Sequence, residues 1–276
     1  MTLLQISEPE RAFAQTRERP LVLSLETATR AGSIAVTRGS RLLAASTGDG
    51  AVSHSINLLS DLEETLAAAR VTLAEIELFA VALGPGSFTG LRIGLATVKS
   101  FAATLGRRCV GIPTLHAVAH AAGPSARTIA MLPAGRGEVY AQLLSVAPSG
   151  EVVPLGDAEN LSPHSLLESL RGLRGLTWAG EGAHAHVEAI TSLAAAEGLT
   201  LMPEGSETGT AQGQLKREGW VLAAQTEALA VNVAYLALLR AGAGETTDPA
   251  DLQALYVRPS DAEINLDAQN KNRTGR

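Results

Sequence analysis

Short runs of aliphatic residues separated by Gly-rich turns recur along the chain. The same arrangement of three such runs occurs twice. The runs of the first copy cover residues 21–25, 33–36 and 41–45. The runs of the second copy cover residues 128–132, 138–146 and 151–155. Short β-branched or aliphatic runs between Gly-rich turns are typical of strands connected as hairpins. The pattern therefore predicts two three-stranded meanders.

Helical spacing follows the first meander. Between residues 55 and 66, apolar side chains recur at steps of three and four, which places them on one helix face. These side chains are Ile56, Leu59, Leu62 and Leu66. A buried strand at 78–83 then leads through a Gly-rich loop into a helix at 91–105 and a short strand at 110–112.

Meanders that continue as alternating helix and strand predict a duplicated α/β fold, in which each of two lobes has a mixed sheet and flanking helices. We expect the first lobe at 21–112 and a second, degenerate lobe at 113–220. The stretch 221–239 is apolar nearly all round, which indicates a buried or interface helix. We expect this helix to return to the first lobe, so that 221–258 completes it.

The composition narrows the class of protein. The formal net charge is −6 and no basic face that would grip phosphates is evident, so any contact with nucleic acid is expected to be indirect. Cys109 is the single cysteine, which excludes an internal disulfide and a Cys-rich zinc site. No clean run of about 20 apolar residues indicates a membrane span. We therefore expect a cytoplasmic protein with flexible polar ends at 1–20 and 261–276.

The Gly-rich loop before the helix at 91–105 is the sharpest motif. Its candidate contact residues are Gly84, Pro85, Gly86, Ser87, Thr89, Gly90 and Arg92. A turn from a strand into a helix exposes backbone amides at the positive end of the helix dipole, which suits an anion. The alternative is a tight turn that needs glycine and nothing more. No Gly-Lys-Ser/Thr follows, so the loop is not a P-loop.

Two further motifs contain histidine. His116 and His120 are four residues apart, so on a helix they would share a face and could hold one metal ion. Apolar residues stand between them and no third ligand is recognisable, so we expect a core pair and no metal. The run 180–186 is either a phosphate-side turn or a plain strand-to-helix turn, and its Glu181 would repel a nucleotide phosphate.

Several short strings together resemble the TsaB family, the non-catalytic subunit of the machinery that makes threonylcarbamoyladenosine in tRNA. They are Leu-Ser-Leu-Glu-Thr-Ala at 23–28, His-Ser at 54–55, the loop with its flanks at 84–94, Gly-Glu-Val-Tyr at 137–140 and Leu-Tyr-Val-Arg-Pro at 255–259. The resemblance covers most of the chain and implies an actin-like duplicated fold. It also implies a catalytic TsaD partner, a TsaE ATPase that joins the complex, and homodimers that form through a similar surface.

The sequence departs from the active members of the actin-like superfamily at two positions. Those members place an aspartate at the end of the first strand of each lobe, where it handles metal and attacking water. The first position here holds Glu26, and the second falls near Pro133-Ala134, which has no carboxylate. The resemblance thus implies an assembly subunit with no chemistry and no cofactor of its own, which meets tRNA only indirectly.

The docking surface for TsaD is expected on the helix that follows the first meander. Its candidate interface residues are Ile56, Leu58, Leu59, Leu62 and Leu66. Two other functions stay open at this point. One is a metal-dependent hydrolase or acyltransferase that uses His116 and His120, and the other is a sugar-kinase-like protein that binds ATP.

Overall fold

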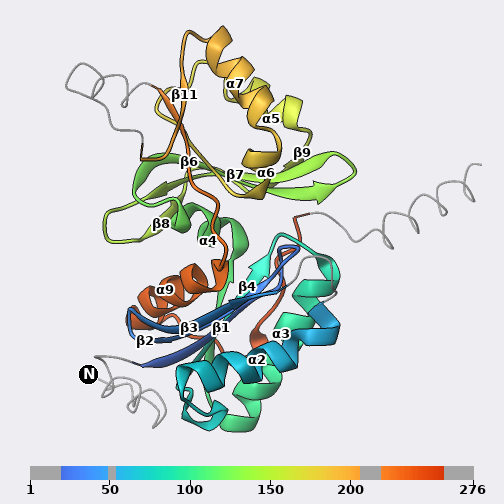
Figure 1. The fold of residues 1–276 in the computed structure, drawn as a ribbon, viewed down its shortest axis with the longest axis vertical. Coiled ribbons are helices and arrows are strands. Elements are labelled where there is room, and N and C mark those ends of the chain that lie inside the picture. The colour runs from blue at the N-terminus through green and yellow to red at the C-terminus, as the bar shows by residue number, and fades with distance from the viewer. Residues whose placement is uncertain (1–19, 49–53, 206–218, 258–276) are drawn as a thin grey trace, which may run out of the picture.

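The computed structural model describes residues 20–48, 54–205 and 219–257, and these residues form two mixed sheets (Figure 1). The first sheet has the order β3-β2-β1-β4-β5. Its strands are β1 (Leu21–Glu26), β2 (Ser33–Arg38), β3 (Arg41–Thr47), β4 (Leu78–Gly84) and β5 (Arg108–Pro113). β1 pairs antiparallel with β2 and parallel with β4, so the predicted meander forms one half of the sheet.

The second sheet repeats this topology. Its order is β8-β7-β6-β10-β12-β11, and β9 also pairs with β7. The strands are β6 (Ser125–Gly135), β7 (Glu138–Val146), β8 (Val152–Pro154), β9 (Glu159–Leu161), β10 (Thr177–Ala179), β11 (Leu201–Pro203) and β12 (Trp220–Leu222). In both sheets a meander is followed by parallel strands on the far side of its first strand. The duplication is therefore visible in the topology itself.

Helices cover both outer faces and fill the space between the sheets (Figure 1). The helices are α2 (His54–Ala69), η1 (Leu73–Glu75), α3 (Phe88–Leu105), α4 (Thr114–Ala121), α5 (Pro163–Ser169), α6 (Glu181–Ala185), α7 (Val187–Ala196), α9 (Leu229–Gly242) and η2 (Pro249–Asp251). α2 and α3 pack with Leu21, Leu23 and Leu25 on the outer face of the first sheet. Val22, which alternates with them, faces the middle layer of α4 and α9. Leu166 of α5 and Ile190 of α7 cover the outer face of the second sheet.

The apolar stretch 221–239 differs from the single helix predicted for it. Its first residues belong to β12, in the second sheet, and α9 begins only at Leu229 and continues to Gly242. A buried parallel strand and a helix buried on both sides are each apolar throughout, so the hydrophobic pattern cannot separate them. The segment that returns to the first lobe therefore starts after β12 rather than at Val221.

Polar contacts fasten α9 and the chain after it to the first lobe. The Ser24 hydroxyl donates to the carbonyl of Ala230 at 2.8 Å, and the Ser33 hydroxyl accepts from the amide of Ala230 at 2.9 Å. Further along, the Lys99 ammonium donates to two carbonyls in 250–252. On these contacts we propose that the first lobe consists of 21–112 and the chain from α9 onward, with the second lobe between them.

Two predictions from the sequence remain, that of flexible termini and that of no membrane span. Apart from Pro20, the predicted flexible termini at 1–20 and 261–276 lie outside the described residues. Among the helices that the structure describes, none is long and apolar enough to cross a membrane.

Candidate functional site

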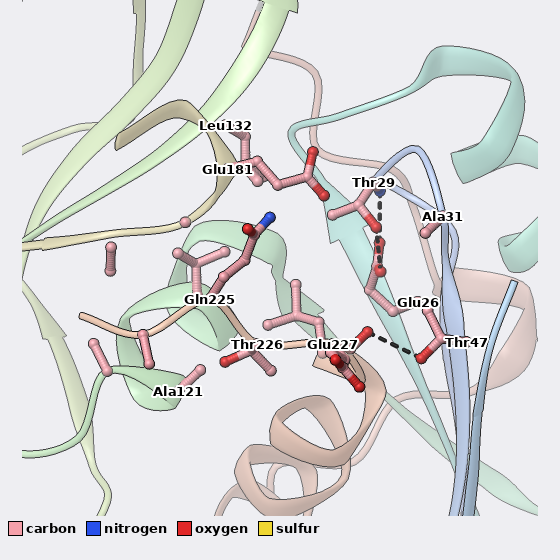
Figure 2. A pocket seen from close by; sticks show the side chains of 16 residues that line it. Glu26, Thr29, Ala31, Thr47, Ala121, Leu132, Glu181, Gln225, Thr226 and Glu227 are labelled. Atoms are coloured by element: carbon pink, nitrogen blue, oxygen red, sulfur yellow. Dashed lines mark hydrogen bonds between the residues drawn. The ribbon is translucent and has the colours of Figure 1, made fainter. Parts of the chain in front are cut away.

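A cleft of about 360 Å³ lies between the two lobes (Figure 2). The end of β1 and the turn after it form one wall, with Glu26 and Thr29. The start of α6 forms the opposite wall, with Glu181. Apolar residues of α4 and the linker from 224 to 229 close the floor. The cleft thus lies where the ends of the two lobes' central strands meet.

Glu26 is buried at the end of β1, with 1% of its surface exposed. Its Oε1 accepts hydrogen bonds from the backbone amides of Ala28 at 2.6 Å and Thr29 at 2.7 Å. Its Oε2 accepts from the Thr29 hydroxyl at 2.7 Å. A charged acceptor makes such bonds short and strong. The carboxylate therefore holds the β1–β2 turn together from inside.

The actin-like fold implies a nucleotide and its metal in this cleft, and the residues present do not fit them. The backbone amides of Ala28 and Thr29 in the β1–β2 turn are bonded to the Glu26 carboxylate. Glu181 extends from the opposite wall toward Thr29 (Figure 2), and Glu227 also lines the cleft. Within the described ranges no group of three histidine, cysteine or acidic residues is placed to hold a metal ion. Carboxylates on both walls repel a phosphate that has no cation beside it.

The carboxyl of Glu181 on the second wall is in an environment that disfavours its charged form. Burial raises the pKa of Glu181, while the positive charge of Arg30 works in the opposite direction. Gly180, next to it, adopts a φ of 93° and packs against the carbonyl of Met131. The run 180–186 thus leads from β10 into α6, as the alternative of a plain strand-to-helix turn predicts, and it lines the cleft through Gly180 and Glu181. The alternative of a phosphate-side turn stays a prediction.

The Gly-rich loop lies outside the cleft lining in the described chain. Glycine is required at positions 86 and 90 by close packing against the β1–β2 turn. A Cβ on Gly86 would overlap Ala28, and a Cβ on Gly90 would overlap the carbonyl oxygen of Thr27. Gly90 also accepts a 2.8 Å hydrogen bond from the Thr27 hydroxyl. The structure therefore supplies a packing reason for glycine that the loop sequence alone could not show.

The start of α3 uses part of the loop's own hydrogen-bonding capacity. α3 begins at Phe88, so Thr89, Gly90 and Arg92 belong to the helix rather than to the loop. Ser87 caps it by accepting from the amide of Gly90 at 3.2 Å, and the Ser87 amide donates to the carbonyl of Ala28 at 2.7 Å. These two amides are therefore engaged within the chain.

The outward side of this helix start carries an aromatic and cationic cluster. The Arg92 guanidinium lies 4.0 Å from the centre of the Phe88 ring, and Tyr256 contacts the same ring with centres 5.1 Å apart. Gly84 lies under the same segment of chain, because a Cβ on Gly84 would come within 2.5 Å of the carbonyl oxygen of Leu255, and Pro85 beside it is buried. The loop and the C-terminal end of the described chain thus form one surface.

His116 and His120 both lie on α4, but they have different surroundings. His116 is 8% exposed, and burial together with the charge of Arg240 lowers its pKa to about 4. His120 shares a 2.8 Å hydrogen bond, through Nδ1, with the side-chain oxygen of Asn232 on α9. A neutral buried ring beside an arginine is a poor place for a cation. This geometry gives the alternative metal-dependent hydrolase no support.

α2 divides the candidate interface residues between two environments. Leu58, Leu62 and Leu66 are buried in the core of the first lobe. Leu59 is 61% exposed. The side chain of Ile56 lies outside the described residues. Helical spacing grouped Leu59 with the buried face because steps of three and four span a broad stripe, whose edge reaches solvent.

Sequence reasoning missed two features of the cleft. Thr29 and Glu227 were not singled out, yet both line it, and the Thr47 hydroxyl donates to the carbonyl of Glu227 at 3.1 Å. The spacing of Thr29 three residues after Glu26 was the available signal, because carboxylate side chains commonly accept from groups two and three residues ahead.

Comparisons with known proteins agree with this architecture. A family model described as "TsaD: tRNA N6-adenosine threonylcarbamoyltransferase" matches residues 49–149. The Escherichia coli K12 protein described as "tRNA threonylcarbamoyladenosine biosynthesis protein TsaB" is 30% identical over 131 residues, which are 43% of this chain and 52% of that protein. A Buchnera aphidicola protein of the same description is 35% identical over 69 residues, 25% of this chain and 33% of that protein. The chain thus spans about half the length, or less, of these relatives.

Solved structures match over a longer range. A Pseudomonas aeruginosa structure, described as an uncharacterized protein with similarity to peptidase YeaZ, has a TM-score of 0.66 at 23% identity and covers 87% of this chain and all of that chain. The structure of YeaZ from Pseudomonas aeruginosa has a TM-score of 0.65 and covers 86% of this chain. The predicted duplicated actin-like α/β fold is confirmed by these neighbours and by the repeated strand order. Part of the sequence is thus similar to proteins described as TsaB, and the fold is similar to that of YeaZ.

Proposed function

We propose that this chain is a non-catalytic subunit of the machinery that makes threonylcarbamoyladenosine in tRNA, and that its first lobe docks a TsaD-type catalytic subunit. Similarity to relatives that are described as threonylcarbamoyladenosine biosynthesis proteins carries this proposal. The TsaD family model also matches this chain, which is consistent with two related subunits that share a fold. A net charge of −6 leaves the grip on tRNA to another subunit.

The state of the cleft supports the absence of chemistry. Glu26 stands where active members of the superfamily place an aspartate, and its oxygens accept three hydrogen bonds from its own turn. At the corresponding end of the second lobe, β6 finishes with Pro133, Ala134 and Gly135, which carry no carboxylate. A general base needs an oxygen that can reach water or substrate. The proposed role is therefore binding and activation of a partner.

The exposed side of α2 is the proposed docking surface. Leu59 is the most exposed of the large apolar side chains in the described chain, and it lies on a helix whose other face is fully packed. Burying a leucine contributes about 1.5–3 kcal/mol, and a charge placed there adds a desolvation penalty of several kcal/mol. We expect Leu59→Asp to block binding of the TsaD-type partner while leaving the isolated chain folded.

Three measurements test the proposal. The first is co-purification of wild type and Leu59→Asp with the TsaD homologue of the same cell. The second is the threonylcarbamoyladenosine content of tRNA, measured by mass spectrometry in a deletion strain carrying each variant. Leu155→Asp is the matched control, because Leu155 is 50% exposed on the second lobe. It should keep both the partner and the modification. A folded Leu59→Asp protein that loses the partner yet supports full modification would disprove the mechanism.

The same surface accounts for the other proposed assemblies. If two copies of the chain pair through α2 in the absence of TsaD, Leu59→Asp should convert a dimer into a monomer in sedimentation experiments. A TsaE-type ATPase is proposed to join only the complex with TsaD. Its binding should therefore be lost together with TsaD in Leu59→Asp and retained in Leu155→Asp.

A further inference from the structure

The β1–β2 turn has the hydrogen-bonding geometry of an anion site. The backbone amides of Ala28 and Thr29 converge on one oxygen, at 2.6 and 2.7 Å, and the Thr29 hydroxyl lies 2.7 Å from the other oxygen of the same group. Successive amides that point at one centre make a concave site that binds phosphate or another oxyanion in many proteins. Here the oxyanion that occupies the site is the carboxylate of Glu26.

We propose that Glu26 is a built-in anion, which fills the phosphate-type site of the first lobe with a group from the chain itself and so closes the cleft to phosphate-bearing ligands. The carboxylate is 1% exposed, so an incoming phosphate cannot share the amides with it. Displacing it would leave a charge buried without its partners, which is strongly unfavourable. Glu181 on the opposite wall adds a second obstacle to an anion.

The occupied site also organises the chain around it. The Thr29 hydroxyl accepts from the amide of Gly32, so the Glu26 network extends through the turn to the start of β2. On the other side, the carbonyl of Ala28 accepts from the amide of Ser87 at 2.7 Å. The Gly-rich loop is therefore hydrogen-bonded to the turn whose conformation Glu26 stabilises. An empty anion site should loosen this contact, and an external anion should restore it.

The second lobe has no equivalent of this site. Its corresponding turn, between β6 and β7, consists of Arg136 and Gly137 alone, whereas six residues separate β1 from β2. A two-residue hairpin turn has no room for a side chain to curl back onto successive amides. The built-in anion is thus a property of the first lobe, and a variant at this one position tests it.

The experiment is chemical rescue of Glu26→Ala by small anions, followed as the melting temperature of the full chain. Formate supplies the missing carboxylate, and inorganic phosphate tests the site for the ligand that Glu26 excludes. Each is compared with chloride at equal ionic strength. We expect formate and phosphate to raise the melting temperature of Glu26→Ala by about 2–4 °C. Wild type should not respond.

Glu77→Ala is the matched control. Glu77 also accepts a backbone amide, that of Leu21 at 2.7 Å, but it accepts only this one and lies outside the turn. It should lose stability without rescue by either anion. Equal responses of Glu26→Ala, Glu77→Ala and wild type would show a general salt effect and overturn the proposal, as would a folded Glu26→Ala that responds to neither anion.

Two further measurements decide the matter if Glu26→Ala is unfolded in chloride. First, formate must return its circular dichroism spectrum to that of wild type, and failure to do so contradicts the proposal. Second, the wild-type chain must not bind inorganic phosphate in calorimetric titration. Binding that also shifts the amide resonances of Ala28 and Thr29 would mean that Glu26 does not close the site. Neither measurement depends on a partner subunit, so this inference stands or falls separately from the proposed function.

Discussion

The two lobes share a strand order, but their outer layers differ. The first lobe is covered by α2 and α3, which have 16 and 18 residues. The second is covered by α5 and α7, with 7 and 10 residues, and five of its seven strands have only three residues. The layer between the sheets is built in the same way from both lobes: the second lobe contributes the helix α4, and the first lobe contributes the helix α9. The two lobes thus share the plan of the interior, and only the first lobe has long helices on its outer face.

The contact between the central strand and the next helix is a second point of comparison. In the first lobe, Gly90 of α3 lies against the carbonyl of Thr27. In the second lobe, Gly182 of α6 lies against Met131 and Leu132, where an added Cβ would come within 2.9 Å of the Met131 Cβ. Both lobes thus use glycine to bring a helix close to the first strand, but a carbonyl oxygen lies in the way within α3 at Gly90 in the first lobe, and only at the N-cap of α6, at Gly180, in the second.

The largest expected effect on stability comes from adding a side chain between α3 and the β1–β2 turn. Gly90→Ala would drive a Cβ into the Thr27 carbonyl oxygen, which belongs to the backbone and cannot rotate away. We expect the free energy of unfolding, measured in urea, to fall by about 3 kcal/mol or more. Gly182→Ala meets less resistance and should cost about 1–3 kcal/mol.

Gly242→Ala is the control for both variants. Nothing lies within 4 Å of its added Cβ, so it should change the unfolding free energy by no more than about 1 kcal/mol. If Gly90→Ala were as mild as Gly242→Ala, the close packing of α3 on the β1–β2 turn would not be the reason for glycine in the loop.

The sequence predicted the fold class and both meanders, because aliphatic runs that alternate with Gly-rich turns indicate hairpin-connected strands. It misplaced the start of α9, since β12 is equally apolar. The site was less accessible to sequence reasoning. Glu26 and Glu181 were singled out separately, but their position across one cleft depends on how the lobes pack. The packing of Gly86 and Gly90 on Thr27 and Ala28 joins segments about 60 residues apart, which no local pattern encodes. The docking residues of α2 stay a prediction.

The middle layer shared by the lobes should respond to pH. Burial and Arg240 lower the pKa of His116 to about 4, below its ordinary value of 6.5. Between these values the unfolded chain binds a proton that the folded chain does not, so stability is full above pH 6.5 and falls as the pH drops toward 4. The shift corresponds to about 3 kcal/mol of unfolding free energy over this window.

His116→Gln measures this contribution, because glutamine does not titrate. Urea denaturation at a series of pH values should show a shallower loss of stability in the variant than in wild type, with the difference confined to the stated window. His164→Gln is the control, since His164 is exposed on α5. Parallel curves for wild type and His116→Gln would mean that the imidazole is not held neutral between α4 and the rest of the middle layer.

The smallest effect distinguishes a helix whose first amides are satisfied by a residue distant in sequence from one that is capped by the residue just before it. Ala228, at the N-cap of α9, has no side chain to satisfy the first amides, and Ser33 of β2 accepts from Ala230 in its place. α5 of the second lobe instead uses its own Ser162, which accepts from Ser165 at 3.1 Å. Each Ser→Ala change should cost about 1 kcal/mol, with the larger cost at Ser33 because its partner is buried. Hydrogen exchange separates the two: Ser33→Ala should expose amides at the start of α9, and Ser162→Ala only those of α5. If Ser33→Ala left exchange at the start of α9 unchanged, the hydroxyl would not be what anchors this helix to the first lobe.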